Sequence, residues 1–197
     1  MTLNGTLLAT ALSASLAMFC GATAASATTK PASKTPAKST THVMSDDDFA
    51  KAAAEGGMAE VKFGQLAEEK GNAEVVKDFG KRMVTDHTRI GDELKTTATA
   101  DKLTLPMELS AHDQAVYDHL SKLSGSAFDR AYAHDMVRDH EVDIAAFKTE
   151  VKDGKNAGLK TFASNALPTL EEHLKLARTM QHDVYPKKAA STTKKQG

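Results

Sequence analysis

An all-α fold of four long helices in two hairpins, with a short extra helix between the hairpins, is predicted by the apolar spacing and composition of residues 44–185. Apolar residues in this region recur in alternating steps of three and four, the spacing of the buried face of a bundled helix. The region is rich in Ala, Leu, Lys and Glu and has no Trp, which favours helices. Its length corresponds to one domain.

The first helix is predicted over residues 46–70. Ser45 is a suitable N-cap, and the acidic run Asp46–Asp48 suits the positive end of a helix dipole. Gly71 and Asn72 then interrupt the helical pattern. The apolar stripe expected to face the core is Phe49, Ala53, Gly56, Glu60, Phe63 and Ala67.

The second helix is predicted over residues 73–100, and a connector with a break at Leu105 and Pro106 follows it. A shorter helix is expected over residues 108–123. This long connection permits a crossover between the two hairpins, because it can carry the chain back along the bundle. The inward stripe of the second helix is Val76, Gly80, Met83, His87, Ile90 and Leu94.

The remaining long helices are predicted over residues 126–152 and 157–182, with a turn between them. Pro168 falls inside the last helix and is expected to kink it and to free a carbonyl one turn back. The inward stripes are Tyr132, Met136, His140, Ile144, Phe147 and Val151 in one helix, and Leu159, Ala163, Ala166, Leu170, His173, Ala177 and Met180 in the other.

Residues 1–27 have the pattern of a signal peptide. An apolar run that is too short to span a bilayer precedes two small-residue cleavage patterns, although no Lys or Arg precedes the run. We therefore expect export to the periplasm, with outer-membrane association as a further option. The only cysteine, Cys20, lies in this segment, so the mature chain would have no thiol ligand or disulfide.

Residues 28–43 and 186–197 are predicted to be disordered, because they are rich in Thr, Lys, Pro, Ala and Ser. Seven of the 25 basic residues are lysines of these segments, which leaves about 18 basic against 26 acidic residues and a central charge of about −8. The basic segments either are solvated tails or make weak contacts with anionic membrane or cell-wall surfaces. The acidic domain argues against nucleic acid as a partner.

A pentapeptide pattern occurs twice, as Met83–His87 and as Met136–His140, and each copy places its histidine on the apolar stripe. Glu60 and His173 occupy the stripes of the other two long helices. All four residues lie within about three residues, or roughly 5 Å, of the middle of their predicted helices. We therefore expect one carboxylate and three imidazoles to meet at one level inside the bundle.

Three interpretations of these four residues remain open. Glu60, His87, His140 and His173 suit one transition metal such as Zn, Fe, Cu or Ni, and they suit Ca and Mg poorly. They also suit a structural polar network, in which Glu60 accepts hydrogen bonds from histidines and from Tyr132. A proton- or ligand-responsive site is the third interpretation.

The other candidate residues are interpreted mainly as structural. Met83 and Met136 are interpreted mainly as core residues, with Cu(I) binding as the alternative. Tyr132 is expected to be a core residue with a bonded hydroxyl. The acidic neighbours of the histidines are expected to serve adjacent helices or solvent, although one of them could orient an imidazole. The histidines interpreted as non-ligands are His42, His112, His119, His134 and His182.

Five segments together resemble a family of exported bacterial proteins known as domain of unknown function 4142, which is grouped with the ferritin-like superfamily. They are Gly57–Val61, Met83–His87, Phe128–Tyr132, Asp139–His140 and Leu167–Leu174. The resemblance covers residues 46–180. It implies a ferritin-like four-helix bundle, usually periplasmic and sometimes labelled an outer-membrane protein, with no settled activity.

Di-iron members of the wider superfamily use two Glu residues and two Glu-x-x-His motifs. Here Val84 and Leu170 occupy the Glu positions of those motifs, and His140 stands where a third helix would offer a Glu. The resemblance therefore disfavours a carboxylate-bridged di-iron centre and fits one metal held by three histidines and Glu60.

The leading functional hypothesis is an exported bundle that binds one transition metal in metal handling or envelope stress, without a catalytic role. The first alternative is a non-catalytic envelope module that works by surface contacts, with the Glu/His residues as a structural network. A metal-dependent redox enzyme is the third hypothesis. The pattern specifies neither the oligomeric state nor a substrate.

Overall fold

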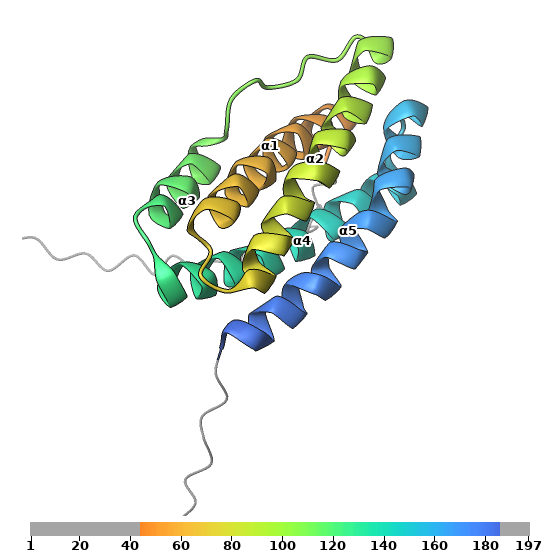
Figure 1. Cartoon of the computed structure of the whole chain (residues 1–197). Helices are drawn as coiled ribbons and strands as arrows, with labels where there is room; N and C mark the ends of the chain where they lie inside the picture. The colour runs from red at the N-terminus through yellow and green to blue at the C-terminus, as the bar shows by residue number, and fades with distance from the viewer. Residues whose placement is uncertain (1–43, 186–197) are drawn as a thin grey trace, which may run out of the picture. The chain divides into compact units, whose positions relative to one another are not determined.

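The structure is a computed structural model that describes residues 44–185. The signal peptide, the basic linker and the Lys-rich tail expected from the sequence lie outside the described residues. Within that part, which belongs to one compact unit, every regular element is a helix (Figure 1). The helices are α1 (Asp46–Lys70), α2 (Glu74–Asp101), α3 (Ala111–Ser121), α4 (Gly125–Asp153) and α5 (Ala157–Val184).

The four long helices pack as two hairpins, α1 with α2 and α4 with α5. The hairpins join because α1 also packs against α4 and α2 against α5, so that α2 and α4 are diagonal neighbours. The chain between α2 and α4 therefore crosses the bundle, and α3 packs on α1 along this path (Figure 1). None of the helices in residues 44–185 combines the length and apolarity needed to span a bilayer.

The apolar stripes predicted from the sequence face the core. On α2 and α5 every residue of the predicted stripe is buried, and on α1 and α4 the exceptions, Ala53, Gly56 and Val151, are partly buried. Helix ends fall within three residues of the predicted positions. The largest difference is at α3, which begins after Ser110 because the Ser110 hydroxyl caps the helix by accepting the Asp113 N–H at 3.1 Å.

Two carboxylates tie the hairpins together at opposite ends of the bundle. The buried Asp129 carboxylate near the start of α4 accepts the N–H groups of Asn72 and Ala73, in the α1–α2 turn, at 2.8 and 3.0 Å. At the other end, the Asp46 carboxylate accepts the Asn156 N–H, in the α4–α5 turn, at 2.6 Å. Each hairpin turn is thus bound to the first helix of the other hairpin.

Pro168 does not interrupt α5, which is helical from Ala157 to Val184. The proline has no N–H to donate, so the Ser164 carbonyl one turn back loses its usual helical partner. Because Ser164 is exposed, water can satisfy that carbonyl. The freed carbonyl expected from the sequence therefore does not face the core.

Candidate metal centre

A layer of buried polar side chains divides the core into two apolar clusters. One cluster, which includes Phe63, Met83 and Met136, lies at the end of the bundle where α4 begins. The other, which includes Ile90, Ile144 and Leu170, lies at the end where α5 begins. The layer between them consists of the four residues selected from the sequence, Glu60, His87, His140 and His173, each at most 3 % exposed.

The three imidazoles converge from α2, α4 and α5. One ring nitrogen from each of His87, His140 and His173 lies within 4.8 Å of the others. The ring centroids are 5.2 Å apart for His87 and His173, 5.3 Å for His140 and His173, and 5.7 Å for His87 and His140. The expectation that these side chains share one level of the bundle is confirmed.

Hydrogen bonds fix the orientation of two of the rings. His140 Nδ1 lies 2.9 Å from the Met136 carbonyl oxygen, which can only accept, so Nδ1 carries the hydrogen and Nε2 keeps its lone pair. His173 Nε2 lies 2.8 Å from Asp86 Oδ2, which by the same reasoning leaves the lone pair on Nδ1. Neither lone-pair nitrogen has a hydrogen-bond partner among the described residues, and His87 Nε2 has none either.

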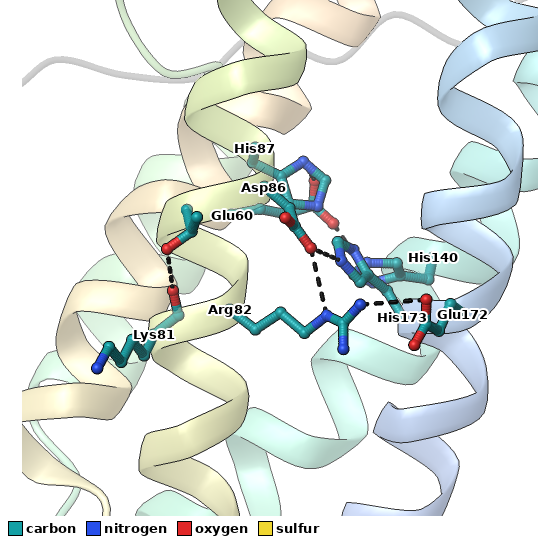
Figure 2. A network of polar contacts seen from close by, with 9 residues as sticks. Glu60, Lys81, Arg82, Asp86, His87, His140, Glu172 and His173 are labelled. Carbon is teal, nitrogen blue, oxygen red and sulfur yellow. Dashed lines mark hydrogen bonds and ion pairs between the residues drawn. The ribbon is translucent and has the colours of Figure 1, made fainter.

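Asp86 has a more specific role than the sequence pattern predicts, where it is only one of the acidic neighbours of the histidines. It precedes His87 on α2 and points about 100° away from it, toward α5. Asp86 Oδ2 also lies 3.3 Å from Arg82 Nε, and the Arg82 guanidinium reaches Glu172 on α5 at 3.1 Å (Figure 2). This chain of contacts joins α2 to α5 at the level of the histidines and holds the His173 ring.

Glu60 faces two of the histidines by their Nδ1 edges. Its Oε2 lies 2.9 Å from His87 Nδ1, and its Oε1 lies 3.3 Å from His140 Nδ1. These distances suit hydrogen bonds, but the angles do not, so neither carboxylate oxygen has a hydrogen-bond partner among residues 44–185. Glu60 therefore lies close to two imidazoles without a hydrogen bond to them, and it is outside the group of three converging nitrogens.

Burial sets the protonation of the layer. It lowers the pKa of His87 to about 4 and the pKa of His173 to about 3, although the hydrogen bond to Asp86 opposes the shift at His173. Burial also lowers the pKa of His140. It raises the pKa of Glu60 to about 7, against the opposing charge of His140. At neutral pH the three imidazoles are therefore neutral, the form that binds metals.

Asp86 behaves differently because it has partners. Burial raises its pKa, but the hydrogen bond from His173 and the charge of Arg82 outweigh that effect, so the net pKa lies below the ordinary value. Asp86 is thus an ionised acceptor at neutral pH. This supports the assignment of the hydrogen to His173 Nε2.

Two further groups near the layer differ from expectation. The Tyr132 hydroxyl is fully buried and has no hydrogen-bond partner among the described residues, so the expected bonded hydroxyl is not formed. Asp143 on α4 was not selected from the sequence. Burial and the neighbouring Glu60 raise the pKa of Asp143 well above its usual range. Asp143 lies one turn from His140 but outside the apolar stripe of α4, so the stripe does not indicate it.

A profile of the family described as "Domain of unknown function (DUF4142)" matches residues 28–180. The chain belongs to this family. The match begins before Asp46, where the resemblance found from sequence motifs starts. No curated protein matches the chain.

A solved structure shares the helical fold of this DUF4142 protein. It is the crystal structure of a conserved hypothetical protein, rv2844, from Mycobacterium tuberculosis. The TM-score is 0.56 at 19 % sequence identity, and the alignment covers 74 % of this chain and 95 % of the other. At that identity the likeness concerns the fold alone.

The donor set of the DUF4142 chain fits a transition metal in chemistry and nearly in geometry. Nitrogen ligands on a tetrahedral ion lie about 2.0–2.1 Å from the metal and so about 3.3 Å from one another. The three converging nitrogens lie within 4.8 Å, so the rings need to move inward by at most about 1.5 Å. Three neutral imidazoles, each with a buried and unpartnered nitrogen, suit Zn, Cu, Ni or Fe.

Other sequence candidates lie elsewhere. Met83 and Met136 are fully buried in the apolar cluster at the end where α4 begins. Of the histidines interpreted as non-ligands, His42 lies outside the described residues, and the other four are exposed to solvent. They do not belong to the converging group.

Proposed function

We propose that this DUF4142 domain binds one transition-metal ion at mid-bundle through His87, His140 and His173. Two observations carry the proposal: each of the three imidazoles brings a nitrogen within 4.8 Å of the others, and each has one buried nitrogen without a hydrogen-bond partner among residues 44–185. Leaving a polar atom buried and unpaired costs about 1–3 kcal/mol, and three such atoms at one point are offset by one shared ion. The ion would be Zn, Fe, Cu or Ni.

In this proposal Glu60 stays at the centre as the acidic partner of the ligands. The sequence pattern predicts Glu60 as a fourth ligand, but its oxygens lie 2.9 and 3.3 Å from the Nδ1 atoms of His87 and His140. These Nδ1 atoms carry hydrogens when the opposite nitrogens bind an ion. A carboxylate in that place balances the charge of the metal. The fourth position then remains for water or another small ligand.

The test is the metal content of protein purified without chelators and without a His-tag, measured by mass spectrometry. We expect about one ion per chain, lost in His140→Ala and in His173→Ala. The matched control is His134→Ala, which removes an exposed histidine from the same helix as His140. Metal-free, folded protein that also rejects added Zn, Cu, Ni and Fe would contradict the proposal.

A structural polar network is the second candidate, favoured by the contacts that join Asp86, Arg82 and Glu172 across α2 and α5. In that case the histidine variants change the stability of the bundle and leave the metal content of the protein at zero. The proposal and this alternative therefore differ in one measurement.

We further propose a ferritin-like bundle that is exported to the periplasm and acts in metal handling. The two hairpins and the crossover connection support the first part, and the apolar run with its cleavage patterns in residues 1–27 supports the second. Removal of residues 28–43 and 186–197 tests whether the basic segments hold the protein at the envelope. Loss of envelope association with unchanged metal content would assign these segments an anchoring part separate from the metal centre.

A further inference from the structure

A groove of about 600 Å³ opens between α1 and α2, beneath connector residues 103–107. Its origin lies in four glycines. A Cβ on Gly64 would lie 2.7 Å from the Gly80 carbonyl oxygen, so the two helices touch there. A Cβ on Gly57 or on Gly91, which both line the groove, would meet no atom within 4 Å. The two helices are therefore in backbone contact at one level and leave space at the next.

Three of the residues that line the groove are Glu60, His87 and Asp143. Glu60 and His87 lie side by side in Figure 2. Both oxygens of Glu60 and Nε2 of His87 lack a hydrogen-bond partner among residues 44–185. The other charged lining groups, Lys62 and Lys95, are exposed at the rim.

We propose that this groove binds a small primary amine with an apolar body, whose ammonium group lies between Glu60 and Asp143. The walls are mainly small and apolar side chains, which suit an aliphatic body, and the volume falls in the range of about 300–1,000 Å³ found for small-molecule sites. A primary ammonium has three donors, and the carboxyl groups of Glu60 and Asp143 among the lining residues offer acceptors. This inference goes beyond metal binding.

The sign of the charge excludes an anionic head at the same place. An anionic head would place a third acidic group beside Glu60 and Asp143, and it could not donate a hydrogen bond to either. An ammonium group can instead donate to the oxygens of Glu60, which lack a hydrogen-bond partner among residues 44–185. The rim lysines do not compete for the acids, since both are exposed and Lys95 pairs with Asp92 at 3.1 Å.

The amine site and the metal centre are separable by mutation. The groove is lined by His87 but not by His140 or His173, so replacing His173 removes a metal ligand without removing a lining residue of the groove. A metal ion and an ammonium group at adjacent positions repel each other. Each therefore weakens the binding of the other by the same factor.

The experiment is isothermal titration calorimetry on the full chain after its metal has been removed with a chelator, with n-octylamine and octanoate as probes. The two molecules share one apolar body and differ in the sign of the head group. We expect saturable binding of one octylamine per chain and at least tenfold weaker binding of octanoate. Octanoate that binds as tightly as octylamine would place the head at the rim lysines and overturn the proposal.

Three variants locate the site. Asp143→Asn should weaken octylamine binding at least tenfold, and Gly91→Leu should abolish it by filling the groove. Leucine favours a helix more than glycine does, so the second variant should fold and keep its metal. His173→Ala should lose metal and keep octylamine affinity within twofold. Unchanged octylamine affinity in both Asp143→Asn and Gly91→Leu would disprove the amine site, whatever the metal content shows.

Discussion

Nε2 of His173 lies 2.8 Å from Oδ2 of Asp86, and this contact decides which nitrogen of His173 keeps its lone pair. The hydrogen on Nε2 is held by the carboxylate, so the lone pair stays on Nδ1, which is buried and has no hydrogen-bond partner among the described residues. Asp86 in turn is held by Arg82 at 3.3 Å. Asp86, which is not itself a proposed metal ligand, can thus determine whether the three histidines are able to bind a metal.

Asp86→Ala should reduce metal affinity by about 10- to 100-fold, the usual effect of removing the acidic partner of a ligating histidine. The measurement is competition with a chromogenic chelator at fixed pH. Asp92→Ala is the matched control, because Asp92 is an exposed aspartate of the same helix whose side chain pairs with Lys95 at 3.1 Å. Equal affinity in the two variants would argue that Asp86 serves only to join α2 to α5.

Metal should stabilise the folded protein by mass action. An ion at 100 times its dissociation constant adds about 2.7 kcal/mol to the free energy of unfolding, because it binds the folded state. Thermal unfolding of the metal-free protein with and without added Zn measures this gain as a rise in Tm. The rise should vanish in His140→Ala, whereas His134→Ala should retain it. A rise of equal size in both variants would point to ions bound elsewhere on the surface.

Alanine at two helical glycines should have opposite effects on stability. A Cβ on Gly80 would lie 2.7 Å from the Gly64 carbonyl oxygen, so Gly80→Ala forces α1 and α2 apart and should cost about 1–3 kcal/mol. Gly91→Ala meets no atom within 4 Å and should add roughly 0.5–1 kcal/mol through helix propensity. Urea unfolding curves measure both changes. Destabilisation of similar size in both variants would rule out the close helix contact as the cause.

Glu150 should make stability depend on pH. It is 3 % exposed, its Oε1 has no partner among the described residues, and burial together with Asp46 raises its pKa. A carboxyl whose pKa is higher in the folded than in the unfolded chain stabilises the fold below the unfolded value of about 4.3, and this stabilisation is lost as the pH rises through the folded value.

Glu150→Gln should therefore match the parent protein near pH 4 and exceed it in stability at pH 7, by a few tenths to about 1 kcal/mol. Urea unfolding at several pH values between 4 and 7 measures the difference. The control is Glu69→Gln on α1, which replaces an exposed glutamate and should give no trend with pH. A parallel trend in the two variants would assign the pH dependence to general charge effects.

The helices and their inward faces could be predicted from the sequence because both are periodic properties of the chain. A stripe such as Val76, Met83, Ile90 and Leu94 specifies a face without knowledge of its neighbours, and all four residues are buried. The same periodicity placed His87, His140 and His173 at one level. Side chains at equal heights on the inward faces of the helices therefore meet in the core.

Partners between helices could not be predicted in the same way. The contact of Asp86 with His173 depends on which helix lies beside α2, and the connector crossover decides that. The place of Glu60 beside the Nδ1 edges depends on side-chain rotation, which a helical stripe does not fix. The Tyr132 hydroxyl is expected to be bonded by a general rule for buried phenols, but it has no hydrogen-bond partner among residues 44–185.

The two carboxylates at the ends of the bundle have a consequence for its centre. Sliding one hairpin along the other by one helical turn, about 5.4 Å, would break the Asp129 contacts at one end and the Asp46 contacts at the other. Such a slip would also carry His140 and His173 past His87. The Asp129 and Asp46 contacts at the two ends of the bundle therefore help to hold the imidazoles in alignment. A substitution in either hairpin turn can misalign the three histidines although the turn is not in contact with them.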